Sequence, residues 1–296
     1  MSAEPPVYVV VLNYRNYGDT IECVHALQRT GYPNLKILLI DNGSDNESER
    51  VLRAEFPDLE FVQTGRNLGY SGGNNVGLRR ALEDEAEFAV ILNNDTLVHE
   101  DFLEPLVEHA RNDPSAGVLG SLVLNTDGTV DRMCARRRPP LGEILWNHGP
   151  GRWFGLHGGW QRASYYDGID ALDRPREVDV VSGACLMLRT EMLRRIGVLD
   201  DRTFLFWEEF ILAEKLRQSD FRTVLVPASR VVHKGGGSMK TVRIRAALYF
   251  MQSLNLYLAE YRGVGRLKRY FVMIGPALFF IPGILKTISG VRRLRS

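Results

Sequence analysis

Two adjacent glutamates in the aromatic segment FLFWEEF are the side chains best suited to acid–base chemistry. Glu208 and Glu209 follow three aromatic residues and precede Phe210 at the start of an expected helix. Apolar neighbours disfavour the charged form of a carboxyl group and raise its pKa toward the range useful to a general base. We therefore consider this glutamate pair a candidate for general-base chemistry. The alternative is a pair of acidic residues that complement the dipole of a helix N-terminus.

A second carboxylate, Asp95, ends the apolar run FAVILNND. At the tip of a strand in an α/β sheet, such a group can bind a divalent cation that bridges two phosphates. An aspartate that only caps the next helix, together with Thr96, is the competing interpretation. Asp41 stands at the tip of an earlier strand and could accept hydrogen bonds from a base or ribose, although an ordinary Asx turn competes there.

The Gly/Asn-rich stretch from Asn67 to Gly77, NLGYSGGNNVG, opens another expected helix. Free backbone N–H groups and the helix dipole favour phosphate at such a position. The stretch is not GxGxxG and no GK[ST] follows, so dehydrogenase and P-loop sites both lose support. A glycine-rich turn that needs positive φ is the alternative.

Short β-branched apolar runs alternate with amphipathic stretches over about the first 120 residues, the pattern of parallel strands joined by crossover helices. We expect strands at 7–12, 35–40, 60–63, 88–92 and 117–122. The first four each end in a polar or glycine-containing segment, and in open α/β sheets ligands bind at the carboxyl ends of strands. These segments should therefore line one crevice.

The remaining elements are less regular. Residues 125–178 lose periodicity and read as a substrate loop or a partly mobile excursion. The arginine triplet 136–138 within this region could contact diphosphate or an anionic acceptor. The alternative is that it forms a solvated basic loop. The aromatic residues of the region could stack on sugars or simply pack; they are Trp146, Trp153, Phe154 and Trp160. Pattern returns at 178–188, with helices near 191–196 and 208–218 and a strand at 223–226.

The charge is unevenly distributed although the net charge is only +1. Residues 240–296 carry 11 lysines and arginines against Glu260, which leaves 26 basic and 35 acidic residues before them. This part reads as basic, apolar helix, and it includes the uncharged 16-residue run 270–285, which two prolines interrupt. A spanning helix needs about 20 residues. Without a nucleic-acid-binding signature, the tail fits an anionic membrane surface better than nucleic acid, and packing on the protein itself is the alternative.

Composition excludes other classes. With 296 residues, 45% of them hydrophobic, the chain can bury a large core. Three cysteines cannot form a closed disulfide set and show no zinc spacing. The N-terminal residues lack a secretory pattern, so we expect a reducing, cytoplasmic location.

Seven segments together resemble the family-2 glycosyltransferases of the GT-A fold, and they span roughly residues 7–238. They are VVLNY, LLIDNGS, RNLGYSGGNNVG, VILNNDT, VSGACLMLR, FLFWEEF and VVHKGGGS. Among relatives, the chain looks most like rhamnosyltransferases that use a dTDP-activated sugar to build bacterial surface polysaccharides.

The resemblance implies roles for particular residues. The family's metal-binding DxD signature stands here as Asn93-Asn94-Asp95, with only the last carboxylate, and the resemblance makes His233 a metal or diphosphate ligand. Carboxylate with imidazole suits Mn²⁺, whereas Mg²⁺ prefers more oxygen ligands. Glu209 occupies the usual base position, while Ile211 stands where relatives have a further acid. The expected donor-binding residues are Asn13, Tyr14, Asp41, Asn67, Gly69, Gly73, Asn74, Asn94 and Asp95.

The sequence therefore predicts an α/β protein with a GT-A (Rossmann-like) mixed sheet flanked by helices. Residues 1–239 form the catalytic domain (1–122 binding the nucleotide sugar, 123–239 the acceptor), and 240–296 form a helical, membrane-associating tail. The expected function is inverting transfer of a sugar, rhamnose first, from a dTDP- or UDP-sugar to a lipid-linked or polysaccharide acceptor. The expected cofactor is Mn²⁺ or Mg²⁺. We expect a cytoplasmic protein that binds peripherally to the inner face of the cell membrane and that could form a homo-oligomer.

Three competing functions stay open at this stage. A UDP-hexose or UDP-GlcNAc transferase of the same family differs only in its donor. A nucleotidyltransferase would need a basic glycine-rich loop soon after the first strand, which residues 13–19 lack. A sugar-binding relative without catalysis is suggested by Asn93 and Ile211, where acidic residues are missing.

Overall fold

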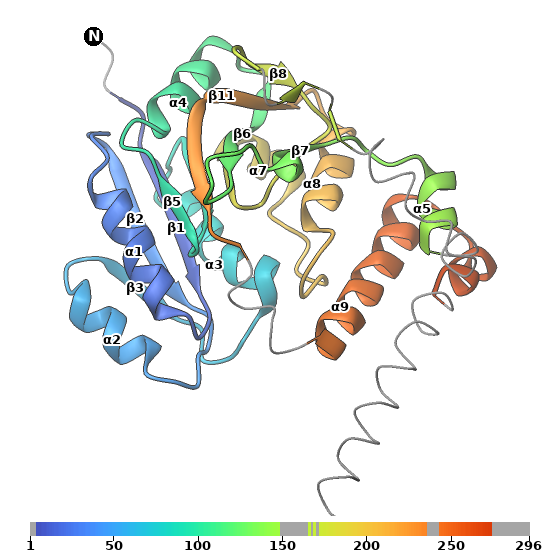
Figure 1. Cartoon of the computed structure of the whole chain (residues 1–296), viewed down its shortest axis with the longest axis horizontal. Coiled ribbons are helices and arrows are strands. Elements are labelled where there is room, and N and C mark those ends of the chain that lie inside the picture. The colour runs from blue at the N-terminus through green and yellow to red at the C-terminus, as the bar shows by residue number, and fades with distance from the viewer. Residues whose placement is uncertain (1–3, 149–164, 167, 170–171, 236–242, 274–296) are drawn as a thin grey trace, which may run out of the picture.

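A mixed β-sheet of nine strands forms the centre of the protein (Figure 1). The computed structural model describes residues 4–148, 165–166, 168–169, 172–235 and 243–273. The strands of this sheet are β1 (Val7–Asn13), β2 (Leu35–Asp41), β3 (Glu60–Gln63), β4 (Phe88–Asn93), β5 (Thr96–Val98), β6 (Ala116–Leu124), β8 (Arg176–Glu177), β10 (Cys185–Arg189) and β11 (Arg222–His233).

Their spatial order is β3-β2-β1-β4-β10-β6-β11-β5, and β8 pairs with β11. The first four strands are mutually parallel, whereas β10 runs antiparallel between β4 and β6. This antiparallel strand makes the sheet mixed, as the sequence predicted. The four strands predicted nearest the N-terminus are confirmed to within a residue.

Helices cover the sheet and connect its strands. They are α1 (Tyr17–Gln28), α2 (Ser48–Glu55), α3 (Gly69–Glu83), α4 (Leu103–Asn112), α7 (Thr190–Ile196) and α8 (Glu208–Leu216). The run VYVVVLN of β1 is almost wholly buried, as expected for a parallel strand covered on both faces. Its burial, with that of β2 and β4, forms the main core.

The region 125–178 contains more structure than its sequence suggested. It includes η1 (Arg132–Cys134), β7 (Ala135–Arg136) and α5 (Leu141–His148). β7 pairs with β9 (Val180–Val181) in a separate two-stranded sheet. The expected unpatterned excursion is therefore wrong for these elements, because residues about 45 positions apart complete the pairing. Trp153, Phe154 and Trp160 lie outside the described residues.

The C-terminal part is helical where the structure describes it. α9 (Arg243–Leu256) continues into the π-helical turn η3 (Tyr257–Tyr261), and residues 266–273 form a last helix. Leu254, Tyr257 and Leu258 are buried against Trp207 and Ile211, forming a second, smaller core. This packing is the alternative that the sequence left open for the tail. None of the described helices is both long and apolar enough to cross a membrane.

Candidate active site

A row of hydrogen-bonded polar side chains runs along the carboxyl ends of the first strands. Asn94 donates to Thr20 Oγ1 (2.9 Å), and Thr20 donates to Asn13 Oδ1 (2.9 Å). Asn13 then donates to Asp41 Oδ1 (2.7 Å). The sheet thus brings together the ends of β4, β1 and β2, as the sequence predicted.

Asp41 is fully buried and all its contacts are internal. Its carboxylate accepts hydrogen bonds from Asn13, Ser44 and Gln63. The hydrogen bonds from Ser44 form a local turn at Asp41, which is the alternative to nucleotide binding that the sequence left open. Asn13 is equally buried, whereas Tyr14 is half-buried beside the Arg15 guanidinium.

The Gly/Asn-rich stretch forms the start of α3, and much of it serves packing. Asn67 Oδ1 accepts the backbone N–H of Gly69 (2.8 Å), which forms an Asx turn that leads into the helix. Gly73 is packed against Leu12, and a Cβ there would lie 2.6 Å from a Leu12 methyl carbon. Asn74 is fully buried and donates to the carbonyl oxygen of Tyr70. Gly69 has φ +77° and abuts the backbone of residue 204.

Asp95 and His233 meet although 138 positions separate them in the sequence. His233 Nε2 lies 3.1 Å from Asp95 Oδ1, and both side chains are partly exposed. The antiparallel pairing of β11 with β5 brings them together. The hydrogen bond to Asp95 raises the pKa of His233 above its usual value.

The pair suits an open site for a divalent cation. The two side chains are hydrogen-bonded to each other at 3.1 Å, and a carboxylate oxygen and an imidazole nitrogen are both ligands suited to Mn²⁺. The remaining ligands would come from water and phosphate oxygens, because the described residues contain no cluster of three or more His, Cys, Asp or Glu side chains arranged for a metal. Asp95 and His233 therefore fit the expected ion as a two-ligand site.

Glu208 and Glu209 begin α8 in contrasting surroundings. The Glu209 side chain is 19% exposed, and its Oε1 accepts the backbone N–H of Gly183 (3.1 Å). Glu208 is only 7% exposed, and its Oε2 has no hydrogen-bond partner. Burial, followed by the charge of Glu209, raises the pKa of Glu208 well above its usual value. Glu209 is thus the accessible carboxylate of the two.

Arg136 is a site residue whose contact the sequence did not indicate. Its Nη2 lies 3.4 Å from Glu209 Oε1, and its guanidinium stacks on the Phe210 ring. Arg138 makes two hydrogen bonds (2.7 and 3.1 Å) to Glu214, which lies on α8 with Glu209. The solvated basic loop considered for the triplet is therefore wrong for Arg136 and Arg138, because α8 supplies their acidic partners, whereas Arg137 is exposed.

The backbone before Glu208 adopts an uncommon conformation. Phe206 and Trp207 both have positive φ, 71° and 70°, which costs free energy in residues with a Cβ. Packing of Trp207 on Tyr257 holds this turn in place. Such strain is concentrated at functional sites in proteins.

The segment Gly183-Ala184 joins the two halves of the site. On one side, Gly183 N donates to Glu209 and its carbonyl accepts the Tyr70 hydroxyl (2.8 Å). On the other, the Ala184 carbonyl accepts the backbone N–H of Asn93 (3.0 Å). A Cβ at Gly183 would lie 2.8 Å from the Tyr70 hydroxyl and 2.9 Å from Glu209 Oε1, so a larger residue would displace these two side chains.

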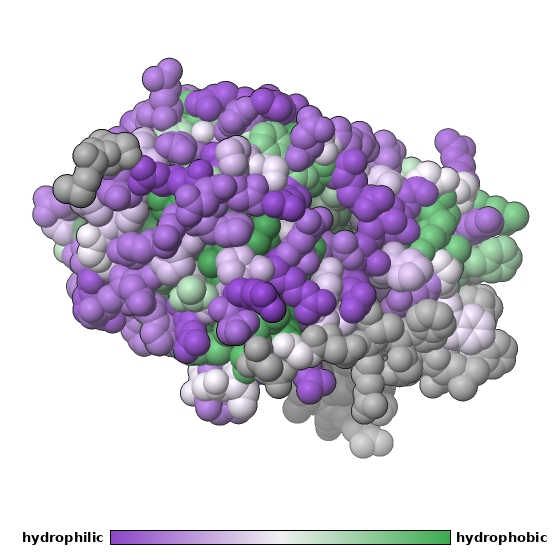
Figure 2. Space-filling model, turned by 90° about the horizontal axis from the view of Figure 1, so that it is seen from above, coloured by the Kyte–Doolittle hydropathy of each residue, from purple (hydrophilic) through white to green (hydrophobic). Residues whose placement is uncertain are grey.

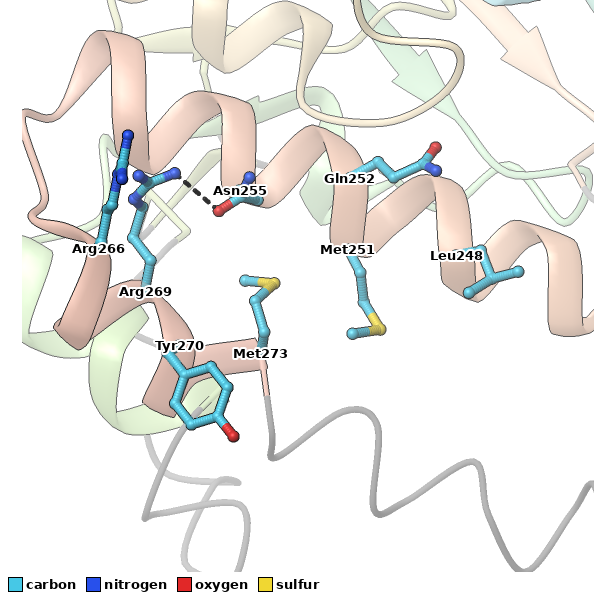
Figure 3. Close-up of a pocket in the computed structure, with 8 residues that line it drawn as sticks. All are labelled: Leu248, Met251, Gln252, Asn255, Arg266, Arg269, Tyr270 and Met273. Atoms are coloured by element: carbon cyan, nitrogen blue, oxygen red, sulfur yellow. Dashed lines mark hydrogen bonds between the residues drawn. The ribbon is translucent and has the colours of Figure 1, made fainter.

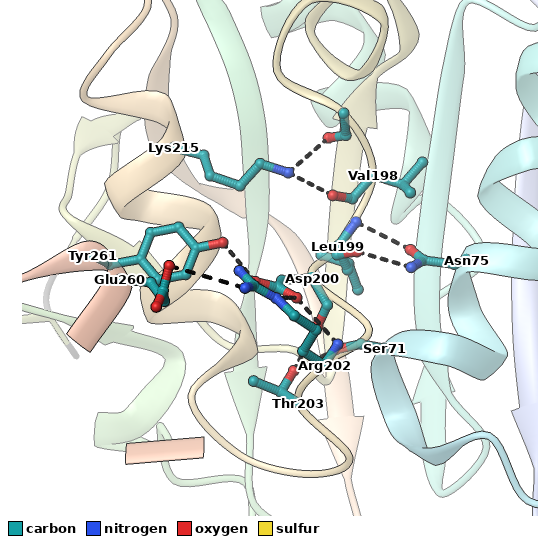
Figure 4. A network of polar contacts seen from close by, with 11 residues as sticks. Ser71, Asn75, Val198, Leu199, Asp200, Arg202, Thr203, Lys215, Glu260 and Tyr261 are labelled. Carbon is teal, nitrogen blue, oxygen red and sulfur yellow. Dashed lines mark hydrogen bonds and ion pairs between the residues drawn. The ribbon is translucent and has the colours of Figure 1, made fainter. Parts of the chain in front are cut away.

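A polar network anchors the loop that leads to Glu208 (Figure 4). Asn75 on α3 exchanges two hydrogen bonds with the backbone of Leu199 (2.8 and 3.0 Å). Asp200 accepts hydrogen bonds from Arg202 and from the Tyr261 hydroxyl (2.6 Å). These bonds hold the pKa of Asp200 down at about 2, against the opposing effect of its burial. The loop is therefore fixed both to the glycine-rich helix and to η3.

The mixed sheet, with polar residues at its strand ends, has the architecture of the GT-A glycosyltransferases. The Glycosyl transferase family 2 model matches residues 8–197, and the chain belongs to that family.

Two of its relatives are named as sugar transferases. The chain is 29% identical over 209 residues to N-acetylglucosaminyl-diphospho-decaprenol L-rhamnosyltransferase of Mycobacterium tuberculosis, covering 67% of this chain and 66% of the relative. It is 23% identical over 220 residues to the low-salt glycan biosynthesis hexosyltransferase Agl10 of Haloferax volcanii, covering 72% of this chain and 62% of that protein. The matches thus span just under two thirds of these relatives' own lengths.

Solved structures share the fold. The mannosyltransferase PcManGT from Pyrobaculum calidifontis, in complex with GDP-Man and Mn²⁺, superposes with a TM-score of 0.57 at 16% identity, covering 100% of this chain and 82% of the other. GalNAc-T7 with UDP, GalNAc and Mn²⁺ gives 0.62 at 16% identity, covering 88% and 50%.

Proposed function

We propose that this glycosyltransferase inverts the anomeric centre as it moves a sugar from a nucleotide diphosphate to a hydroxyl group of a lipid-linked or polysaccharide acceptor. The observation that carries the proposal is the shared Gly183-Ala184 segment, which contacts Glu209 on one side and the end of β4 on the other. A base and a diphosphate site on either side of one short segment suit displacement at a carbon between them.

Glu209 would accept the proton of the acceptor hydroxyl. The hydroxyl oxygen then bonds to the anomeric carbon from the face opposite the diphosphate, as the bond from that carbon to the leaving oxygen breaks. Arg136 and the Gly183 N–H would keep the Glu209 carboxylate oriented before the transfer.

Asp95 and His233 would hold the divalent cation, Mn²⁺ or Mg²⁺. Such an ion supplies Lewis-acid neutralisation of the charge on the departing diphosphate. Both solved structures described above contain Mn²⁺, which supports a metal without choosing between the two ions.

Rhamnose from dTDP-rhamnose is the first candidate donor, because the mycobacterial relative is named a rhamnosyltransferase. A UDP-hexose or UDP-GlcNAc donor is the second candidate, supported by the hexosyltransferase name of the archaeal relative. Tyr14, Asn67, Gly69 and Asn94 are proposed to contact the donor directly. The buried Asn13, Asp41, Gly73 and Asn74 would shape the strand ends and helix beneath it.

At the level of domains, we propose that 1–239 carry the catalytic residues and that 240–296 face a membrane, with the described helices of 243–273 packed on α8 as part of the catalytic fold. The acceptor named for the mycobacterial relative is a decaprenol diphosphate, and the positive charge of residues 240–296 suits the inner face of a cytoplasmic membrane.

Thermal-shift and transfer assays test the proposal. Candidate dTDP- and UDP-sugars are screened with Mn²⁺, Mg²⁺ or EDTA, and the true donor should raise the unfolding temperature more than the others.

Glu209→Gln should lower turnover by about two orders of magnitude or more while donor binding stays nearly intact. Glu108→Gln, on an exposed position of α4, is the matched control. Wild-type turnover in Glu209→Gln would remove Glu209 from its role, and nucleotide-sugar binding without any transfer or hydrolysis would favour an inactive sugar-binding relative.

A further inference from the structure

Two helices near the C-terminus, α9 and the last helix 266–273, border a shallow, open groove with a volume of about 490 Å³ (Figure 3). Each helix contributes four residues at the spacing i, i+3, i+4, i+7, which places them on one face. From α9 these are Leu248, Met251, Gln252 and Asn255, and from the last helix Arg266, Arg269, Tyr270 and Met273.

The groove has a polar end and an apolar end. Arg269 Nη1 donates to Asn255 Oδ1 (2.9 Å), and Arg266 lies beside them. In the other direction along α9, Met251 and Leu248 follow (Figure 3). An amphiphilic ligand with an acidic head and an apolar chain matches this order of side chains.

The basic end carries unused hydrogen-bonding capacity. Arg269 Nε is buried without a partner, which costs free energy unless a ligand accepts from it. Among the described residues, no carboxylate forms an ion pair with Arg266 or Arg269. The nearby Glu260 is instead within 4.0 Å of Arg202. An anionic oxygen would satisfy both guanidinium groups.

Exposed hydrophobic side chains surround the groove. The exposed fractions are 53% for Leu248, 71% for Leu267, 63% for Tyr270 and 48% for Phe271. In Figure 2 hydrophobic surface gathers at the end of the molecule where α5 and the C-terminal helices lie in Figure 1. Clustered apolar and basic side chains of this kind suit a membrane interface, where aliphatic and aromatic groups enter the acyl boundary.

We propose that this groove binds the headgroup phosphate of an anionic phospholipid, with Arg266 and Arg269 on the phosphate and the lipid's apolar part along Met251, Met273 and Leu248. The groove would thereby attach the enzyme to the membrane at a defined place. This inference rests on the membrane-facing role proposed above and locates it.

Vesicle co-sedimentation of the full chain tests the groove. Wild-type protein is mixed with phosphatidylcholine vesicles that contain or lack phosphatidylglycerol. A basic residue near an anionic surface contributes about 1 kcal/mol, or about fivefold in partitioning. Arg266→Gln with Arg269→Gln should therefore weaken binding to the anionic vesicles by about twenty- to thirtyfold. Arg29→Gln, an exposed arginine at the end of α1, should leave binding unchanged.

The apolar end has its own variant. Leu248→Ser changes an exposed side chain, so it should fold normally and still weaken vesicle binding severalfold. Unfolding temperatures of all variants identify any that are misfolded, and in that case the exposed single variant Arg266→Gln decides, with an expected loss of about fivefold.

The outcomes separate the groove from the broader proposal. If the wild-type protein does not co-sediment with anionic vesicles, both the membrane-facing role and the proposed lipid binding in the groove are contradicted. Wild-type protein that binds them, together with groove variants that bind equally well, overturns the groove alone and assigns binding to other basic residues of the chain. Glycosyl transfer is not part of the readout, so its failure is detected separately.

Discussion

Glu208 and Glu209 are adjacent, yet they lie in different environments. Glu209 is the more exposed of the two and lies beside the Arg136 guanidinium and the backbone N–H of Gly183. Glu208 is buried, with an unpartnered oxygen and an acidic neighbour, which favour its neutral form. The exposure of Glu209 to an acceptor hydroxyl is the reason to keep it as the predicted base. The apolar environment that the sequence suggested for the base is instead that of Glu208. Glu209 lies beside Arg136, a contact that no sequence pattern indicates.

Glu208→Gln should stabilise the protein in a pH-dependent way. Because the folded-state pKa of Glu208 is raised above 4.5, its stability contribution is fully present below that pH and is lost as the pH rises through the folded-state pKa. Glutamine stays neutral, so the unfolding temperature of the variant should exceed that of wild type at neutral pH, with a gap that narrows on acidification. Thermal unfolding from about pH 5 to 8 measures it. A gap that does not change with pH would contradict a buried neutral Glu208.

Asp95→Ala and His233→Ala should each weaken Mn²⁺-dependent binding of a nucleoside diphosphate by about tenfold or more. Each substitution removes one of the two side chains that can hold the ion. Calorimetry with Mn²⁺ and then with EDTA measures the metal-dependent part, and His99→Ala at an exposed position is the control. If both variants bind as wild type does and EDTA leaves activity unchanged, the metal mechanism is wrong.

At the scale of elements, strand prediction succeeded where burial is local and failed where pairing is distant. β1 and β4 are uninterrupted apolar runs, so their sequence alone indicates strands covered on both faces. β5 has three residues and β7 and β8 have two, and they exist only because β11 and β9 lie beside them. The one predicted segment 178–188 is two strands, β9 and β10, on different sheets.

The glycine-rich stretch shows the same limit. Its composition was compatible with phosphate binding and with a tight turn, and sequence could not separate these. In the structure, Gly73 and Gly77 lie where α3 crosses β1, over Leu12 and Val10 respectively. Close helix–strand packing therefore explains these two glycines.

Gly77→Ala should destabilise the protein. A Cβ at this position would lie 2.5 Å from both γ-carbons of Val10, inside a fully buried contact. Overpacking costs about 1–3 kcal/mol, and the better helix propensity of alanine returns at most about 1 kcal/mol. Gly18→Ala, in α1 with no atom within 4 Å of the new Cβ, should be neutral or slightly stabilising. Urea unfolding compares the two, and equal midpoints would contradict the packing role of Gly77.

For the whole molecule, the C-terminal helices belong to the catalytic part as much as to any tail. Glu214 of α8 is buried among Arg138, Arg262 and the Tyr257 hydroxyl, which donates to it at 2.8 Å. The Ser253 hydroxyl donates to the carbonyl of residue 205, in the loop that precedes Glu208. A sequence boundary at residue 239 follows a change in composition, but it cuts across these contacts.

The three cysteines are buried free thiols, so the fold is held together without disulfide bonds. Cys23, Cys134 and Cys185 are free, and burial raises the pKa of Cys134 to about 11 and of Cys185 to about 12. The second core instead holds the C-terminal helices to α8 by apolar contact and by the charges around Glu214.

Truncation after residue 239 should therefore damage the catalytic part, whereas truncation after residue 273 should not. The shorter chain loses Leu254, Tyr257 and Leu258, each fully buried, and burial of each such side chain is worth about 1.5–3 kcal/mol. It also leaves Glu214 without two of its partners and uncovers Trp207, whose left-handed backbone positions Glu208 and Glu209. We expect residues 1–239 to unfold at a much lower temperature than residues 1–273, to bind a hydrophobic dye and to lose transfer activity. Circular dichroism melts and dye fluorescence measure this, and an unchanged melt for residues 1–239 would show that the tail is a separable domain after all.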